Sequence, residues 1–500
     1  MSDFVRLDPA DNVVTAIRPL EVGVTIESAS TQSLIPRGHK IAARSIAKGE
    51  KIIKYNQVIG YAVRDLAAGE HVHVDECEFR ATDVEYTFET DIRPVTMVAE
   101  DQRDTFQGYR RADGRAGTRN YIAVLSSVNC SATACKHIAD AFGPEELAAY
   151  PNVDGVVAFT HGTGCGNYGE GMKALQNVMW GYARHPNVGG VVMVGLGCEG
   201  NQIEWLMEAF GLEVGPRFQW MNIQNVAGLR RTIEVGIQKV KAMLPVVNDI
   251  QRETCSASDL TVALQCGGSD AWSGVTANPA VGYASDLLVA QGGTTVLGET
   301  PEIYGAEHLL CARASEETGK KLLGFVQWWE DYTRRNYATL NNNPSPGNKA
   351  GGLTTILEKS LGATAKGGTS PLTAVWEYGE QVTTRGFTFM NSPGYDPASV
   401  TGQVAGGSNL VVFTTGRGSA FGCKPSPSIK VATNTELATK MPEDMDINAG
   451  TIITDGKSVE EVGREIYQYW LDVASGKPSK SEGQGLGDLE FVPWQIGATL

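Results

Sequence analysis

The sequence lacks any apolar run of the ~18 residues that a membrane-spanning helix needs. Its first residues, MSDFVRLDPADN, contain acidic side chains and no apolar segment of the kind found in secretory signals. An excess of positive charge is also missing, and the formal net charge of −15 disfavours a general partner of nucleic acids or of anionic membrane surfaces. We therefore expect a soluble, cytoplasmic protein that binds neither nucleic acid nor membranes.

Regularly spaced cysteine pairs, which would indicate a disulfide framework, are absent as well. The nine cysteines are odd in number and scattered along the chain, as expected for reduced thiols. The 42% hydrophobic and 20% charged residues are ordinary for a globular protein. Because 500 residues exceed the size of a single hydrophobic core, we expect two or three domains.

The N-terminal part of the chain has the pattern of a small β-domain. Short β-branched segments bounded by turn residues occur at residues 12–14, 40–42, 51–53 and 58–63. Two similar turns, IAKGE and LAAGE, lie between such segments. We predict a β-domain over residues 1–76 and, because the next stretch is polar and aperiodic, a linker over residues 77–107.

From Gly108 the pattern changes to apolar runs that alternate with amphipathic segments. Such alternation predicts parallel sheets with crossover helices, an α/β fold. The strand-like strings YIAVLSSV, DGVVAFT and GGVVMVGLG indicate one α/β domain over residues 108–250, with a helix predicted at 229–248. The strings LTVALQCGG, GGTTVLGE, PLTAVWEYGE and NLVVFTTGRG indicate a second α/β domain over residues 251–500.

Four cysteines end apolar runs or open the loops after them, namely Cys130, Cys165, Cys198 and Cys266. His161 lies shortly before Cys165. Ligands of open α/β sheets bind at the carboxyl ends of the strands, so these side chains are candidate ligands of iron or another borderline metal. The alternative is that they are small buried side chains, since free cysteine is among the most buried residue types.

Carboxylates form a second group of candidates in the last domain. Asp270 follows Cys266 in the string CGGSD, and Glu299 and Glu302 follow the strand-like TTVLG. Carboxylates in such positions bind divalent cations or act as general bases. A second interpretation of the glutamates stays open, because Pro301 is typical of a helix start that one of them would cap.

Basic and amide side chains are candidates for binding an anionic substrate. Asn348 and Lys349 lie in the tight loop NPSPGNKAGG, and Arg417 stands between two glycines in TTGRGSAFG. A guanidinium binds a carboxylate through two hydrogen bonds, whereas a lysine supplies a point charge. In the β-domain, the string RGHK adds His39 and Lys40.

Two further motifs allow other functions. His71 and His73 would share one face of a strand, as a metal or substrate contact or simply as a solvated surface. Residues 195–200, GLGCEG, match the G-x-G-x-x-G pattern of a dinucleotide-binding loop, and Glu213 would then contact the ribose. An NAD-dependent oxidoreductase of hydroxy acids is therefore an alternative function.

Long and uncommon strings then identify a family. GYRRADGRAGTRNYIAVLSSVNCSA, VMVGLGCEGNQ, NPSPGNKAGG and MDINAGTI follow one another along the chain. In these strings, and over essentially all 500 residues, the sequence resembles the altronate/galactarate dehydratases. IPRGHKIA and VIGYAV resemble the β-clip (SAF-type) domain of that family. Arg119, in the first string, is a further candidate for binding the substrate.

The resemblance implies a hydro-lyase that uses ferrous iron (Fe2+) to dehydrate a six-carbon aldonate or aldarate to a 2-keto-3-deoxy acid. It also implies a homodimer formed by the middle domain and a Rossmann-like C-terminal domain with a metal site, which points to Asp270, Glu299 and Glu302. Another divalent metal, and an iron–sulfur cluster on three of the cysteines, stay open.

The chemical difficulty is the removal of a weakly acidic proton next to a carboxylate. A divalent metal and the positive charges of Arg417 and Lys349 would stabilise the resulting enolate. We predict Asp270 or Glu299 as the base, and a histidine, His39 or His161, as the acid that protonates the departing hydroxyl.

The sequence patterns indicate the type of reaction but point to more than one substrate. The string QRETCSASDLTVALQCGGSDAWSG resembles the galactarate type, whereas HVHVDE and GETPEIYGAEHLL resemble the altronate type. The family also includes sulfo-lyases that cleave the C–S bond of 3-sulfolactate, usually with the small domain on a separate chain. A protein that only binds sugar acids is the remaining alternative.

Overall fold

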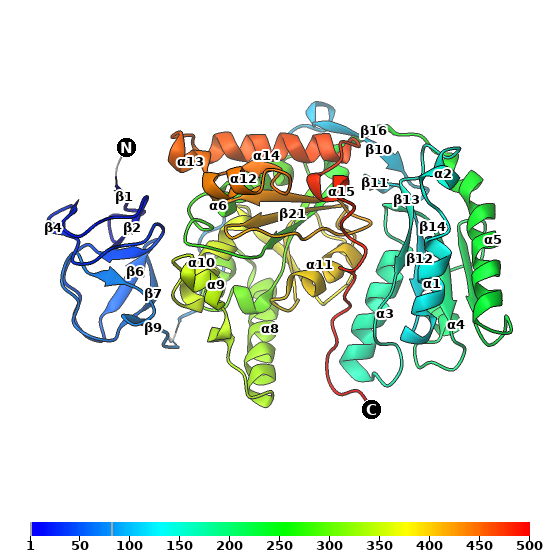
Figure 1. The fold of residues 1–500 in the computed structure, drawn as a ribbon, viewed down its shortest axis with the longest axis horizontal. Coiled ribbons are helices and arrows are strands. Elements are labelled where there is room, and N and C mark those ends of the chain that lie inside the picture. The colour runs from blue at the N-terminus through cyan, green and yellow to red at the C-terminus, as the bar shows by residue number, and fades with distance from the viewer. Residues whose placement is uncertain (1–2, 82–83) are drawn as a thin grey trace.

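The computed structural model describes residues 3–81 and 84–500 (Figure 1). A small β-domain lies at one end, the C-terminal α/β domain in the middle and a second α/β domain at the other end. Small antiparallel sheets precede two parallel sheets that are flanked by helices, which confirms the predicted fold class. Among the described helices, none is both long and apolar enough to cross a membrane.

The β-domain consists of short antiparallel strands. They span Phe4–Val5 (β1), Val13–Ala16 (β2), Thr25–Ile26 (β3), Ala29–Ser30 (β4), Lys40–Ala42 (β5), Lys51–Lys54 (β6), Gln57–Ala62 (β7), His71–Val72 (β8) and Cys77–Glu78 (β9). They pair in the orders β1-β2-β5-β8, β6-β7-β9 and β3-β4. The two similar turns end in Gly49 and Gly69, whose φ angles of 80° and 88° favour glycine.

The segment after β9 runs along the C-terminal domain to strand β10 (Thr105–Arg110), with one short 3-10 helix at Glu100–Gln102. Its described residues contact the C-terminal domain. The Tyr86 hydroxyl donates a hydrogen bond to Glu307 at 2.7 Å, and Phe88 packs against the core of the C-terminal domain.

The second domain has a four-stranded parallel sheet of order β13-β12-β14-β15. Its strands span Tyr121–Ser126 (β12), Gly155–Phe159 (β13), Val188–Gly195 (β14) and Phe218–Asn222 (β15). Its helices span Ala132–Ala139 (α1), Pro144–Leu147 (α2), Gly169–Ala183 (α3), Ile203–Phe210 (α4) and Leu229–Asn248 (α5). Strands β10, β11 (Ala116–Gly117) and β16 (Glu253–Ser256) form a small antiparallel sheet that joins this domain to the next.

The C-terminal domain contains seven parallel strands in the order β19-β20-β18-β17-β21-β22-β23. They span Thr261–Cys266 (β17), Thr294–Leu297 (β18), Leu372–Trp376 (β19), Gly386–Met390 (β20), Leu410–Thr415 (β21), Ser428–Ala432 (β22) and Ile447–Asn448 (β23). The helices span Ala277–Ala290 (α6), Glu307–Cys311 (α7), Glu316–Arg335 (α8), Pro346–Ala350 (α9), Ile356–Thr364 (α10), Asp396–Ala405 (α11), Thr435–Lys440 (α12), Thr451–Thr454 (α13), Val459–Ala474 (α14) and Lys480–Gly483 (α15).

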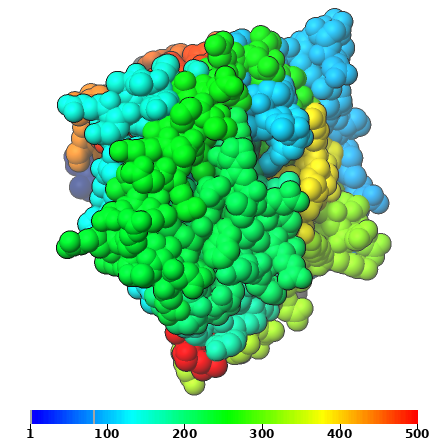
Figure 2. All heavy atoms as spheres, turned by 90° about the vertical axis from the view of Figure 1, so that its right-hand side faces the viewer, coloured from blue at the N-terminus to red at the C-terminus, as the bar shows by residue number. Residues whose placement is uncertain are grey.

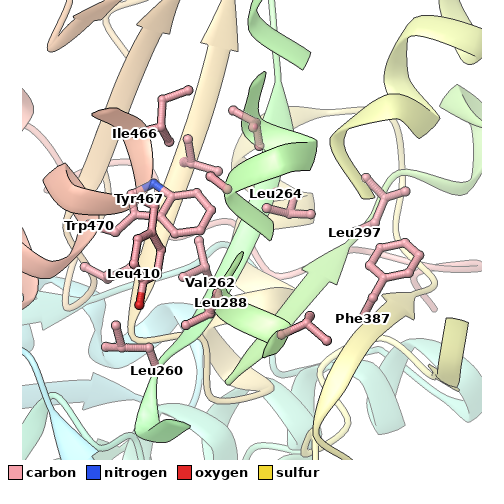
Figure 3. Close-up of a cluster of buried hydrophobic side chains, with 14 of the residues drawn as sticks. Leu260, Val262, Leu264, Leu288, Leu297, Phe387, Leu410, Ile466, Tyr467 and Trp470 are labelled. Carbon is pink, nitrogen blue, oxygen red and sulfur yellow. The ribbon is translucent and has the colours of Figure 1, made fainter. Parts of the chain in front are cut away.

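The two faces of this sheet bury different side chains because residues alternate along each strand. Val262 and Leu264 of β17 belong to the cluster between the sheet and helices α6 and α14, where Trp470 is fully buried (Figure 3). Ala263, between them, belongs to the cluster on the opposite face. Both faces are therefore covered, which explains the uninterrupted apolar runs of the central strands.

The strand order of the C-terminal sheet reverses at β17, which pairs with β18 on one side and with β21 on the other. Loops that leave neighbouring strands at such a point diverge, and ligands bind in the crevice between them. The loops after β17 and β21 contain Asp270 and Arg417. The fold thus brings two of the predicted site residues to one place.

Candidate active site and metal centre

A pocket of about 210 Å³ opens between these loops and the β-domain. Its charged lining consists of Arg37, Asp270, Arg417, Glu436 and Lys440. Arg37 comes from the β-domain and forms an ion pair with Glu436 at 2.9 Å. Arg417 and Lys440 supply the further positive charge of this pocket, which suits an anionic ligand. We call it the rim pocket.

Asp270 is the carboxylate of the rim pocket, and hydrogen bonds hold it in one orientation. Its Oδ1 accepts from the backbone N–H groups of Trp272 and Ser273, each at 3.0 Å, and from the Thr433 hydroxyl at 3.0 Å. Its Oδ2 accepts from Asn434 at 3.1 Å. Burial raises the pKa of Asp270, and these hydrogen bonds work against that rise.

Gly416 makes this arrangement possible. A Cβ atom at Gly416 would collide with the carboxyl group of Asp270. The loop after β21 can therefore approach the carboxylate closely only because its first residue lacks a side chain. This explains the glycine before Arg417 in the string TTGRG.

A second, fully buried cluster lies at the same edge of the sheet. Cys266, Glu299 and Glu302 each offer a ligand atom, and these atoms lie within 4.8 Å of one another. Lys366 donates to the Cys266 sulfur at 2.8 Å, and Lys359 pairs with Glu302 at 2.6 Å. We call these five side chains the buried cluster.

The two carboxyl groups of the buried cluster differ in their pKa values. Burial, followed by the charge of Glu302, raises the pKa of Glu299 well above its ordinary value. Burial also opposes ionisation of Glu302, but the Lys359 ammonium outweighs it, so the pKa of Glu302 is lowered. Burial raises the pKa of the Cys266 thiol to about 11. One carboxylate is thus held ionised beside a neutral carboxyl and a thiol.

Glu299 has an unusual backbone and environment. It adopts a left-handed conformation, with a φ of 65°, directly before the 3-10 helix Thr300–Glu302. Its side chain makes no capping hydrogen bond there, so the helix-cap interpretation is not the one observed. Both of its carboxyl oxygens are buried and, among the residues that the structure describes, have no hydrogen-bond partner.

The buried cluster fits a divalent metal ion. The orphaned carboxyl oxygens of Glu299, the second oxygen of Glu302 and the Cys266 sulfur are buried and lie close together. Oxygen and sulfur donors in this combination suit a borderline ion such as Fe2+. The two lysines would offset the negative charge that binding creates when Cys266 and Glu299 lose their protons.

Asp396 is a carboxylate at this edge that the sequence analysis missed. It opens helix α11, and its carboxyl group packs against Gly267, next to Cys266. Burial and the charge of Glu302 raise the pKa of Asp396 to about 7. The available signal was its position shortly after the strand-like FTFM, a carboxylate at another strand end.

Lys40 does not face the rim pocket. Its side chain is 0% exposed and pairs with Glu358 at 2.8 Å, while Lys54 pairs with the other oxygen of Glu358 at 2.9 Å. Lys40 also donates to the Gly352 carbonyl at 2.7 Å. These contacts fasten the β-domain to helix α10. We call the three charged residues the interdomain latch.

His39 lies beside the latch with two other imidazoles. Its Nδ1 is 3.0 Å from His71 Nε2, and its Nε2 is 3.4 Å from the carbonyl of Ala350, which lines the rim pocket. The structure therefore places His39 next to the pocket that contains Asp270.

The three remaining predicted metal ligands lie on the second domain. Cys130, Cys165 and Cys198 are exposed, whereas the other six cysteines are buried. Their loops follow β12, β13 and β14 and are hydrogen-bonded to one another, through Asn129 N–H to Thr163 and Asn201 N–H to Gly164. These thiols occupy a different sheet from Cys266, and among the described residues they do not form a set of ligands within 4.8 Å.

His161 also belongs to the second domain. Its Nε2 is 2.8 Å from the carbonyl of Ser126, and its Nδ1 accepts from the Thr163 N–H at 3.2 Å. Both ring nitrogens are thus used within the loops of that domain. The structure does not bring His161 to Asp270.

Backbone N–H groups of the glycine-rich string GLGCEG donate to a side chain of the same string. Glu199 accepts hydrogen bonds from the N–H groups of Leu196 at 3.2 Å and Gly197 at 2.6 Å. A dinucleotide-binding loop would direct such N–H groups at the pyrophosphate. This arrangement disfavours the dinucleotide-binding interpretation.

Arg119 is buried, and all five of its N–H donors are used. Two of them bind Glu482 at 2.7 and 2.8 Å, and the others donate to the carbonyls of Thr118, Val473 and Lys477. Arg119 therefore ties the second domain to the C-terminal end of the chain instead of facing a pocket.

We predict that Arg119→Ala destabilises the protein by about 3–5 kcal/mol, because it leaves the Glu482 carboxylate without its partner. Chemical denaturation measures the loss. A substrate-binding role predicts the opposite pattern, a raised KM with little change in stability. Arg334→Ala, at an exposed ion pair on α8, is the control and should change stability by less than about 1 kcal/mol.

Asn348 and Lys349 occupy helix α9, beside the rim pocket. Asn348 forms a capping box with Ser345 and donates to the Ser269 carbonyl at 2.8 Å, so it positions the loop that contains Asp270. Lys349 is half-buried and immediately precedes Ala350.

A buried, oriented carboxylate beside cationic side chains suits an enzyme that acts on an anionic substrate, and comparisons with known proteins identify the family. Three family models cover the chain in order: the altronate/galactarate dehydratase SAF domain (residues 2–80), the second domain of D-galactarate dehydratase/altronate hydrolase (108–248) and the D-galactarate/altronate dehydratase C-terminal domain (257–499).

Curated relatives agree over the full length. An altronate dehydratase of Bacillus subtilis is 37% identical over 100% of both chains. A galactarate dehydratase (L-threo-forming) of Escherichia coli is 40% identical over 95% of this chain and 93% of its own. The beta subunit of a (2R)-sulfolactate sulfo-lyase of Chromohalobacter salexigens is 32% identical over 78% of this chain and 96% of its own.

The chain therefore belongs to the D-galactarate/altronate dehydratase family. The resemblance noted in the sequence is confirmed, and so is the predicted enzyme class, a hydro-lyase of the sugar-acid dehydratase type.

Proposed function

We propose that this enzyme dehydrates a six-carbon sugar acid of the galactarate or altronate type to a 2-keto-3-deoxy acid. The observation that carries the proposal is the rim pocket, where the oriented carboxylate of Asp270 lies with Arg417 and Lys440 at the switch point of the sheet. The names of the full-length relatives support the same class of substrate.

Binding comes first. The guanidinium of Arg417 suits a two-point contact with the substrate carboxylate, and Lys440 adds a point charge. Both cations would also stabilise the negative charge that develops on this carboxylate when the neighbouring carbon loses its proton. The N–H groups and hydroxyls around Asp270 keep its carboxylate aimed while the substrate binds.

The elimination then needs a base and an acid. Asp270 takes the proton from C2, and the electron pair left behind forms the C2–C3 double bond as the C3–O bond breaks. Asp396 gives its proton to the departing hydroxyl, which leaves as water. The enol at C2 then tautomerises to the ketone, so that substrate becomes keto acid plus one water.

Cys266, Glu299 and Glu302 would hold the ferrous ion that the family resemblance implies. When bound, the ion supplies a Lewis acid for the charge on the substrate. We further propose that the second domain forms the interface of a homodimer. Figure 2 looks onto the end of the molecule that this domain forms, and residues of the domain, cyan to green, fill most of that face. The rim pocket lies between the C-terminal domain and the β-domain, which is at the opposite end.

A sulfo-lyase is the second candidate, supported by the 32% identity to a sulfolactate sulfo-lyase beta subunit. The same base would remove the proton at C2, and sulfite would leave from C3 in place of water. Proton donation to the leaving group would then not be needed.

The test is anaerobic incubation of the enzyme and Fe2+ with galactarate, altronate and 3-sulfolactate. We expect a keto acid from one of the sugar acids, no sulfite, and loss of activity after treatment with a chelator, restored by Fe2+. Sulfite from 3-sulfolactate would favour the second candidate. Full activity without metal would contradict the role of the ion.

A further inference from the structure

Three histidines of the β-domain lie on one sheet face. Strands β5 and β8 pair with Lys40 opposite Val72 and Ile41 opposite His71. Continuing this antiparallel register places His39 opposite His73. Because side chains alternate along a strand and directly opposed residues share a face, His39, His71 and His73 all point to the same side.

The distances between the three rings are short. One ring nitrogen of each histidine lies within 4.8 Å of those of the other two, and His39 Nδ1 is 3.0 Å from His71 Nε2. The ring centroids are 4.5 to 5.6 Å apart. Among the residues described, only one other group of potential metal ligands, in the buried cluster, is this compact.

Two further ring nitrogens of the three histidines have environments that bear on metal binding. His39 Nε2 faces the Ala350 carbonyl at 3.4 Å, the kind of outer contact that fixes the tautomer of a metal-bound imidazole. Its Nδ1 then faces the other imidazoles, 3.0 Å from His71 Nε2. His73 Nδ1 is buried and has no partner within the described part of the chain. A buried nitrogen without a hydrogen bond is costly unless something binds it.

The electrostatic environment favours the neutral imidazoles that a metal requires. Burial lowers the pKa of His39 to about 4 and of His73 to about 3, and it lowers the pKa of His71 as well. The nearest cation, Lys40, is already paired with Glu358 at 2.8 Å. Glu358, which Lys40 shares with Lys54, reduces the repulsion that Lys40 would exert on a metal ion.

We propose that His39, His71 and His73 bind one divalent transition-metal ion, such as Zn2+, Co2+ or Fe2+, at a site separate from the buried cluster. Three imidazoles are a common ligand set for these ions and leave a coordination position for an exchangeable ligand. The site adjoins the rim pocket through Ala350. All three ligands come from the β-domain, and the His39–Ala350 contact links the site to helix α9.

The test uses the full-length enzyme, stripped of metal with a chelator and dialysed anaerobically against Zn2+ or Co2+. We expect the His71→Gln/His73→Gln double variant to bind one equivalent fewer than the wild type and to lose one component of the visible Co2+ spectrum. The Glu299→Gln/Glu302→Gln variant should keep that component. His137→Gln, at an exposed position of α1, is the matched control and should bind as the wild type does.

Equal stoichiometry in the wild type and the double histidine variant would overturn the proposal. If the double variant does not fold, mass-spectrometric mapping of diethyl pyrocarbonate labelling on the wild type replaces it. Zn2+ should then protect His39, His71 and His73 but not His137, and unchanged labelling of all four would also overturn the proposal. Neither readout depends on turnover, so a wrong substrate assignment leaves the result interpretable.

Discussion

Replacing Asp270 by Asn should lower kcat/KM on the sugar acid by about 10²–10⁴-fold, the usual contribution of a positioned general base. Asn has nearly the same shape and can still accept the hydrogen bonds of Trp272, Ser273 and Thr433. It cannot accept a proton from C2. The new amide nitrogen cannot accept the hydrogen bond from Asn434, so a loss of stability of about 1–3 kcal/mol is expected beside the loss of activity. The loss of activity should appear mainly in kcat.

Steady-state kinetics at saturating Fe2+, with thermal denaturation alongside, separate the two effects. Asp140→Asn, at an exposed ion pair on the second domain, is the matched control and should retain wild-type activity. Activity of the Asp270→Asn variant within threefold of the wild type would remove Asp270 from the proposed role and leave the buried cluster to supply the base.

Removing the carboxylate of the interdomain latch should also destabilise the protein strongly. Glu358→Ala leaves two fully buried lysines, Lys40 and Lys54, without their common partner. Breaking a buried ion pair from one side costs about 3–5 kcal/mol, because an uncompensated charge is left behind. Denaturation by urea measures the loss, and Glu317→Ala, at an exposed position of α8, should be near neutral.

The same carboxylate predicts a pH dependence. Despite burial, the two lysines hold the pKa of Glu358 far below its ordinary value. A depressed carboxyl pKa stabilises the folded state above the unfolded value of about 4.3 and loses that contribution as the pH falls further. The wild type should therefore lose stability below about pH 4 more steeply than Glu358→Ala. Parallel slopes for the two proteins would contradict this account.

Much of the fold followed from the periodicity of the sequence. The strings YIAVLSSV, DGVVAFT and GGVVMVGLG form β12, β13 and β14, and the predicted helix at 229–248 is α5. The prediction omitted β15, Phe218–Asn222, which mixes polar and aromatic side chains at a sheet edge. It also omitted β20, Gly386–Met390, and β22, Ser428–Ala432, although both are fully buried strands of the C-terminal sheet.

The sequence indicated which residue types form the candidate site, but not which of them lie next to one another. Asp270 and Arg417 line the rim pocket, and Glu299 and Glu302 belong to the buried cluster, all at the carboxyl edge that the parallel strands share. The four candidate cysteines also follow strand ends, but the chain forms two parallel sheets. The sequence pattern does not show at which of the two sheets a given cysteine lies. Cys266 lies at the C-terminal sheet, whereas the three exposed cysteines lie at the sheet of the second domain.

Burial was the other quantity that the sequence did not reveal. Arg119 and Lys40 were candidate substrate contacts because they are cations next to turn residues, but each is enclosed by carboxylates and carbonyls. His39 needed two partners, His71 and His73, that only the pairing of β5 with β8 brings to it. Asp396 lacked any motif beyond its strand-end position.

The charged contact between the β-domain and helix α10 also bears on how such enzymes can be encoded. Its ion pairs join Lys40 and Lys54 of the β-domain to Glu358 of helix α10. These contacts do not depend on the covalent link between the two domains. A protein cleaved once in the segment between β9 and β10 should therefore persist as a two-fragment complex. Encoding both domains in one chain would then ensure that they are made in equal amounts. The ion pairs, and not the peptide link, would hold them together.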